Sequence, residues 1–277
     1  MFAPMCTTCG TEFPPAETPP ADCPICVDDR QYVNPHGQSW TSLDRLAQSH
    51  RNSFRQEEAG LIGIGVEPHF AIGQRALLVC TPAGNVLWDC VSLIDDATRT
   101  IIDALGGLHA IAISHPHYYS AMVTWSEAFG GVPIHLHEDD RQWVVRPSDR
   151  IDYWSGGTKE LLPGLVAIRT GGHFAGGTVL HWADGAEGKG ALLVGDILQV
   201  TPDRRHVSFM RSYPNYIPLS PAVVERIVSR MAPFSYDRIY GAFWDKIIAC
   251  DARQAVESSA SRYVDAVTGN GPADAEP

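Results

Sequence analysis

Two histidines one residue apart, His115 and His117, lie in the segment IAISHPHYYSAM, directly after an apolar run at residues 110–114. The run predicts a short buried strand. On an extended backbone, residues two positions apart project to the same side, so both imidazole rings could face one metal ion. Taken alone, the pair does not decide between a metal site and two ordinary loop histidines.

Three further polar residues accompany predicted strands. His173 lies in the glycine-rich segment TGGHFAGGTVLHW, just before a strand, where glycines allow the backbone to approach a site closely. Asp196 follows the apolar strand and glycine of ALLVGD, and Asp89 ends the strand of VLWDCV. A carboxylate directly after a buried strand and a glycine is a common place for a metal ligand, so these residues favour the metal interpretation.

In this order and spacing, the four segments resemble the metallo-β-lactamase superfamily over about residues 60–248. That family carries an Asp after an early strand, a His-x-His-x-Asp-His loop, a His in a Gly-His segment, a Gly-Asp pair and a late His. The resemblance implies an α/β fold, a four-layer αββα sandwich with the metal site at one edge between two sheets. By position, His115, His117 and His173 match the first metal site, Asp196 matches the carboxylate that can bridge two metals, and Asp89 matches the acidic residue that supports the ligands.

The sequence departs from the family at the second metal site. Tyr119 and Ser120 stand where the family loop has Asp and His, and the segment IYGAFWDKII lacks the late histidine. All three losses fall on one site, so we expect a single metal ion held by His115, His117, His173 and Asp196. Phe243 and Trp244 are expected to fill the second site with apolar bulk.

The resemblance implies a mononuclear metal-dependent hydrolase that acts on a small ester, lactone, thioester or related substrate through a metal-activated water. Asp196 would orient that water or accept its proton, and the Tyr119 phenol would donate to an oxyanion unless it only packs. Zinc suits three imidazoles and a water, whereas Fe²⁺ suits two His and an Asp. The alternatives are a degenerate, non-catalytic binding member and an Fe(II)-dependent sulfur dioxygenase.

The first 30 residues contain a second metal-binding pattern. Cys6 and Cys9 in CTTCG, and Cys23 and Cys26 in DCPIC, form two C-x₂-C pairs separated by thirteen residues. Each pair makes a tight turn that aims two sulfurs at one point, and two such turns form a tetrahedral S₄ site. The segment resembles zinc-ribbon and rubredoxin-like modules. We expect a structural metal, zinc or alternatively iron, that supplies the folding energy of this module.

The predicted organisation has four parts. Residues 1–30 form the Cys₄ metal-ribbon module, 31–58 a linker, 59–268 the sandwich domain, and 269–277 a disordered tail. His135 and His137 repeat the His-x-His spacing but accompany no other matched motif, so we interpret them as structural. Strands are predicted at 61–66, 75–80, 86–91, 110–114, 165–169, 178–182, 191–194 and 238–240, and helices at 42–48, 97–105, 120–129, from 220, and at 251–267.

Composition restricts the partners. The formal net charge of −11 disfavours non-specific binding to nucleic acid or to anionic membranes. No apolar stretch approaches the roughly 20 residues that span a bilayer, and nothing marks the N-terminus for secretion. Seven cysteines do not suggest a disulfide framework. We therefore expect a cytoplasmic protein with a small-molecule substrate, no nucleic-acid or membrane partner, and possible homo-oligomers.

Overall fold

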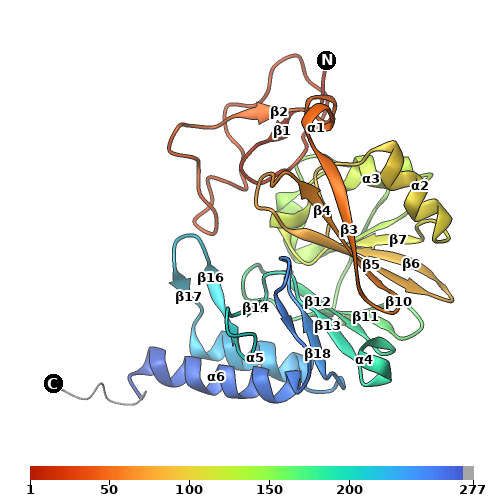
Figure 1. Cartoon of the computed structure of the whole chain (residues 1–277). Coiled ribbons are helices and arrows are strands. Elements are labelled where there is room, and N and C mark those ends of the chain that lie inside the picture. Colours follow the sequence, from red (N-terminus) through yellow and green to blue (C-terminus); the bar gives the residue numbers. More distant parts are fainter. Residues whose placement is uncertain (271–277) are drawn as a thin grey trace.

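A computed structural model describes residues 1–270 of the chain and contains two large β-sheets with helices on both outer faces (Figure 1). The first sheet has seven strands in sequence order: β3 (Arg51–Glu58), β4 (Leu61–Glu67), β5 (Arg75–Thr81), β6 (Gly84–Trp88), β7 (Ala110–Ala112), β8 (Ile134–His137) and β9 (Ile151–Trp154). The strands from β6 to β9 are parallel neighbours. The helical elements of this half are α1 (Leu43–Ser49), α2 (Asp96–Ala104), α3 (Met122–Ala128) and the 3₁₀ turns η1 (Pro116–Tyr118) and η2 (Glu138–Trp143).

The second sheet has six strands: β10 (Thr158–Leu162), β11 (Leu165–Arg169), β12 (Thr178–Trp182), β13 (Ala191–Leu193), β18 (Arg238–Tyr240) and β19 (Ile247–Ile248). Helices α5 (Pro221–Met231) and α6 (Ala252–Thr268) lie against it, with the short α4 (Gly185–Gly188) at one end (Figure 1). Two small hairpins, β14 (Gln199–Val200) with β15 (Val207–Ser208) and β16 (Met210–Ser212) with β17 (Ile217–Pro218), connect β13 to α5.

Three hydrophobic clusters separate these layers. Successive side chains of a strand point to opposite faces of its sheet. In β5, Leu77 and Val79 therefore pack between the two sheets, while Ala76 and Leu78 pack with residues of α2 and α3. A third cluster joins the outer face of the second sheet to α5 and α6. Helices, sheet, sheet and helices thus follow one another, which confirms the predicted αββα class.

The N-terminal module sits at one edge of the sandwich and is closed by the pairing of β1 (Met5–Cys6) with β2 (Trp40–Thr41) (Figure 1). Residues 31–58, predicted to be a linker, contain β2, α1 and β3. The strand β3 pairs with β4 along its whole length and forms the edge of the seven-stranded sheet. Its sequence RNSFRQEE is polar because an edge strand is partly exposed, and charged side chains there discourage pairing with other chains.

The predicted tail begins where α6 ends. Gly269 follows α6 in the left-handed conformation (φ 76°) that commonly ends a helix. Residues 271–277 lie outside the described part of the chain. Within residues 1–270, no helix is both long and apolar enough to cross a membrane.

Candidate metal centres

The structure brings His115, His117, His173 and Asp196 together. One candidate ligand atom from each of the four residues lies within 4.8 Å of those of the others, and all four residues are buried. The strand arrangement explains the convergence. His115 and Asp196 each follow a strand, β7 and β13, and the ends of these strands meet at one edge of the sandwich, where open α/β sheets place their ligands. The backbone N–H of Thr178 at the start of β12 donates to the carbonyl of Ser114, which ties the two sheets together here.

Unpaired polar atoms concentrate at this cluster. Within residues 1–270, seven buried side-chain nitrogen or oxygen atoms lack a hydrogen-bond partner. Four of them belong here: the Nε2 atoms of His115 and His117, the Tyr118 hydroxyl and Oδ1 of Asp196. A buried polar atom without a partner costs about 1–3 kcal/mol. Among these four atoms, Nε2 of His115 and Oδ1 of Asp196 fit a site whose missing partner is a metal ion.

The histidine rings are oriented by their other nitrogen atoms. Nδ1 of His115 lies 2.9 Å from the Ser114 hydroxyl, and Nδ1 of His173 lies 3.2 Å from the Met210 carbonyl, to which it can donate. Nε2 of His173 is then free to bind a metal. It lies 3.1 Å from Nδ1 of His117, close to the separation of about 3.3 Å that two nitrogen ligands of a tetrahedral zinc ion would have.

Burial sets the charge state of the cluster. It lowers the pKa of His115 and His117 well below the ordinary value and that of His173 to about 4. It raises the pKa of Asp196 to about 6. Neutral imidazoles and one ionised carboxylate at pH 7 are the forms that bind a divalent cation.

Asp89 supports the cluster through Ser114. Its Oδ1 accepts the backbone N–H of Ser114 at 2.8 Å and the Ser114 hydroxyl at 2.7 Å, and that hydroxyl contacts His115. Burial raises the pKa of Asp89 to about 7. Gly195 leaves room for this contact, because a Cβ atom there would lie 2.4 Å from the Ser114 hydroxyl. Asp89 thus acts on His115 through a hydroxyl and not by direct contact.

Replacing Asp89 by alanine is expected to weaken metal binding at the histidine cluster by about 10- to 100-fold, because His115 loses its orienting chain. Asp89→Asn keeps an acceptor at Oδ1, so its metal affinity should stay within a few-fold of that of the native protein. Competition with a chromogenic chelator measures both affinities. Equal affinities for Asp89→Ala and the native protein would show that Ser114 needs no support.

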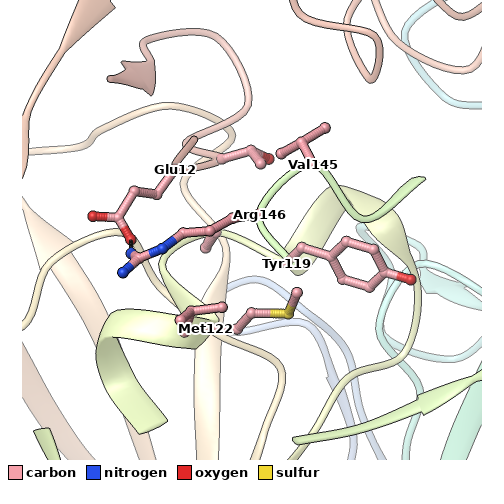
Figure 2. A pocket seen from close by; sticks show the side chains of 8 residues that line it. Glu12, Tyr119, Met122, Val145 and Arg146 are labelled. Atoms are coloured by element: carbon pink, nitrogen blue, oxygen red, sulfur yellow. Dashed lines mark hydrogen bonds and ion pairs between the residues drawn. The ribbon is translucent and has the colours of Figure 1, made fainter. Parts of the chain in front are cut away.

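Tyr118, and not Tyr119, lies beside the histidine cluster. Residues Pro116–Tyr118 form a 3₁₀ turn, in which residues three apart share a face. The Tyr118 ring therefore lies beside His115, with centroids 4.5 Å apart. Burial and the charge of Asp196 raise the pKa of its phenol well above the ordinary value. The Tyr119 hydroxyl instead donates to the backbone carbonyl of Asp140 at 3.4 Å, and its ring lines a different, small cavity (Figure 2).

The other positions of the expected second site hold no metal ligand. The Ser120 hydroxyl accepts a hydrogen bond from the Gln74 amide at 3.0 Å. Phe243 lines the cavity beside the histidines, as apolar bulk at the vacated position would. Trp244 packs elsewhere, over the backbone of Gly63 and Gly65, where a Cβ atom would lie 2.7 Å from its ring.

His135 and His137 lie apart from the cluster. Nδ1 of His135 lies 2.8 Å from the Asp152 carboxylate, and Nε2 of His137 lies 3.1 Å from the Gly156 carbonyl. Both rings have partners between neighbouring elements of the first sheet and its loops. Their placement agrees with a structural role.

The four N-terminal cysteines form the second candidate metal centre. Cys6, Cys9, Cys23 and Cys26 are buried, and the Cys6–Cys26 and Cys9–Cys23 sulfur pairs are each 3.6 Å apart. A disulfide would bring two sulfurs to about 2.05 Å. Two thiolates on one tetrahedral zinc ion lie about 3.8 Å apart, given zinc–sulfur bonds of about 2.3 Å. The spacing therefore fits an S₄ metal site.

A cavity of about 230 Å³ opens onto the histidine cluster. His117, His173 and Asp196 form its floor, and Phe243 and Tyr213 contribute aromatic walls. The two aromatic residues that flank Tyr213 in the segment 201–220 do not line the cavity: Phe209 is fully buried in the core, and Tyr216 is 83% exposed. Gln31 and Tyr32, which follow the cysteine module, were not recognised in the sequence as cavity residues; no local motif marks them.

Comparison with known proteins identifies a relative of nearly the whole chain and solved structures that share its fold. No family model matches the chain. The uncharacterized protein YmaE of Bacillus subtilis (strain 168) is 49% identical over 265 residues, which are 95% of this chain and 96% of YmaE. Among solved structures, the DIM-1 metallo-β-lactamase matches 78% of this chain and 98% of its own, with a TM-score of 0.58 and 12% identity. The mono-zinc form of the metallo-β-lactamase FIM-1 from Pseudomonas aeruginosa matches 78% of this chain and 96% of its own, with a TM-score of 0.56 and 16% identity. The chain therefore belongs to the same family as YmaE and has the metallo-β-lactamase fold, preceded by a Cys₄ module.

Proposed function

We propose that this protein is a mononuclear, zinc-dependent hydrolase that cleaves a small, uncharged ester, lactone or thioester. The observation that supports it most is the cluster of unpaired buried polar atoms beside an accessible cavity, which His117, His173 and Asp196 line. Three imidazoles suit zinc with the fourth position left for a water molecule, beside the Asp196 carboxylate. When bound, zinc lowers the pKa of a coordinated water toward about 7 and polarises the scissile carbonyl.

The side chains of the cluster would take distinct parts in the reaction. His115, His117 and His173 would hold the metal ion, and Asp196 would orient the attacking water and accept its proton. Burial and the nearby charge of Asp196 raise the pKa of the Tyr118 phenol, so it stays protonated at pH 7. Its hydroxyl, and not that of Tyr119, can therefore donate a hydrogen bond within the site. We therefore propose that Tyr118, and not Tyr119, donates the hydrogen bond to the oxyanion.

The cavity lining favours an uncharged substrate. Gln31, Tyr32, Ile72 and Phe243 are among its walls; His69 also lines it, but within residues 1–270 no lysine or arginine does. A phosphoryl or carboxylate substrate would be expected to meet a lysine or arginine. An ester, lactone or thioester with an apolar substituent meets no such requirement.

A panel of chromogenic substrates tests the proposal. The zinc-loaded protein would be assayed with p-nitrophenyl acetate and butyrate, a thiolactone, an acyl thioester, bis-p-nitrophenyl phosphate and a chromogenic cephalosporin. Turnover of the ester or thioester compounds, lost in His115→Ala/His173→Ala, is the expected result. The complete absence of metal-dependent turnover over the panel, with the metal bound, would favour the non-catalytic alternative.

Zinc affinity of the histidine cluster should fall as the pH drops below about 6. Burial raises the pKa of Asp196 to about 6, so in the metal-free protein its carboxyl group binds a proton below that pH, and the proton must leave before zinc binds. The histidines contribute little in this range because burial lowers their pKa values. The expected change is about tenfold per pH unit below 6.

Chelator competition at pH 7.5, 6.5, 5.5 and 5.0, with the Cys₄ site already filled, measures this dependence. Asp196→Asn is the matched control and should show a flat profile over the same range. The same slope in native protein and control would assign the proton to another group.

A further inference from the structure

Part of the cavity wall comes from the N-terminal module. Gln31 and Tyr32 line the cavity together with His117, His173 and Asp196. They follow Cys26 by only five and six residues. The last cysteine of the S₄ site and the cavity wall thus belong to one short, continuous segment.

One side of this segment is held against the histidines. Arg30 forms an ion pair with Asp28, and its guanidinium lies 3.9 Å from the centroid of the Phe174 ring. The Phe174 ring in turn packs on His115, His117 and His173, with centroid distances of 5.6, 4.9 and 5.2 Å. The module therefore contacts the aromatic ring against which all three metal-binding imidazoles pack.

The other side is held by the β16–β17 hairpin, which faces the module in Figure 1. Arg211 pairs with the Asp29 carboxylate at 2.9 Å. The Asn215 side-chain amide donates to the backbone carbonyls of Asp29 and Gln31, each at 2.9 Å. Tyr213 of the same hairpin lines the cavity, so the hairpin and the segment together close one side of it.

The module also docks on the loop that carries the histidines. The backbone N–H of Glu12 donates to the Ser120 carbonyl at 3.0 Å. The buried Glu12 carboxylate accepts a hydrogen bond from Thr124 and pairs with Arg146, as Figure 2 shows for Arg146. The cavity left at this interface measures about 10 Å³, room for one water molecule at most. Ser120, a position of the expected second metal site, thus serves to dock the module.

We propose that residues 28–32 form a substrate-recognition wall of the metal cavity and that the metal ion of the four cysteines holds this wall in place. The inference rests on the proposed function, because it assumes a substrate bound at the histidine cluster. Tyr32 is 47% exposed and lines the cavity with an aromatic side chain, and Gln31 offers an amide. Together with Ile72 and Phe243, these groups suit an apolar or aromatic substituent attached to the reacting carbonyl.

Two hydroxamic acids test the wall without requiring turnover. Acetohydroxamic acid can reach only the open position of the histidine-bound metal, whereas 4-phenylbutyrohydroxamic acid also extends a phenyl group along the cavity; the closed S₄ site offers no open position to either. Calorimetric titration of the zinc-loaded full chain gives both affinities. Tyr32→Ala should weaken binding of the phenyl compound about tenfold and leave the affinity for acetohydroxamic acid unchanged, because only the apolar contact is lost.

Three further variants complete the comparison. Phe2→Ala removes an exposed aromatic of the same module that lies outside the cavity lining and should change neither affinity. Cys9→Ala/Cys26→Ala, and the latch variant Arg211→Ala/Asn215→Ala, which retains all four cysteines, should both reproduce the effect of Tyr32→Ala. Unchanged binding of the phenyl compound in Tyr32→Ala and in the latch variant would overturn the proposal.

If neither hydroxamic acid binds to the native protein, the proposed open metal site is contradicted. Hydrogen exchange then still tests whether the cysteine-bound metal holds the wall in place. Amides of residues 27–33 and 210–217 should exchange faster in Cys9→Ala/Cys26→Ala than in the native protein, whereas those of α6 should not change. Unchanged exchange at 27–33 would show that the cysteine-bound metal does not hold the wall, and would overturn that part of the inference by itself.

Discussion

Replacing Asp196 by asparagine is expected to lower kcat for hydrolysis by about 10²- to 10⁴-fold, the range typical for loss of a proton acceptor in the reaction. The asparagine side chain places an oxygen where the carboxylate oxygen was but cannot accept a proton. The three histidines, each positioned by its own contacts, should still hold the metal ion. Steady-state kinetics on the best substrate of the panel, with the metal content measured in parallel, separate loss of the proton acceptor from loss of metal.

Asp140→Asn is the matched control for this substitution. Asp140 is also buried, its pKa is also raised to about 6 by burial, and its carboxylate accepts the Gly176 N–H at 2.9 Å, an interaction that asparagine can keep. It lies outside the metal-binding set, so kcat should change less than about threefold. A variant Asp196→Asn that retains its metal and more than a tenth of native kcat would remove Asp196 from the reaction.

Replacing Cys9 and Cys26 by alanine is expected to unfold the N-terminal module while the sandwich remains folded. The module has few apolar core residues besides its cysteines, mainly Phe13 and Ile25. Binding of a structural zinc ion contributes about 10–16 kcal/mol in small zinc-finger peptides, far more than such a core supplies. The sandwich has three large hydrophobic clusters of its own.

Limited proteolysis followed by mass spectrometry measures this effect. Cleavage within residues 1–39 should accelerate by at least tenfold in the double variant, whereas the two large sheets stay protected. Cys250→Ala, which replaces an exposed cysteine outside the module, should behave as the native protein. A module that stays resistant after the metal is lost would show that its docking contacts suffice to fold it.

Much of the fold and of both metal centres could be predicted because their signals are local. Cysteine pairs at two-residue spacing make their turn wherever they occur, and polar residues directly after buried strands meet where parallel strands end. His115 and Asp196 carry signals of this kind, whereas His173 lies in a glycine-rich segment just before a strand. The continuous apolar runs of β5 and β6 likewise indicated buried strands.

The features that were not predicted depend on contacts distant in the sequence. An extended backbone was assumed after His115, but the 3₁₀ turn Pro116–Tyr118 brings Tyr118 and not Tyr119 beside the cluster. The edge strand β3 carries polar residues because it is half exposed, so its pattern resembles that of a linker. Gln31 and Tyr32 reach the cavity only through the docking of the module, which the Glu12–Arg146 ion pair between positions far apart in the chain helps to fix.

Anomalous diffraction from crystals of the native protein, measured at the zinc and iron absorption edges, tests the arrangement of two separate metal centres most directly. Two peaks per chain are expected, one among the four cysteine sulfurs and one among His115, His117, His173 and Asp196. The edge at which each peak appears identifies its metal. A third peak beside Tyr119 and Ser120, or no peak at the histidine cluster in crystals that contain the cysteine-bound metal, would contradict a mononuclear hydrolase.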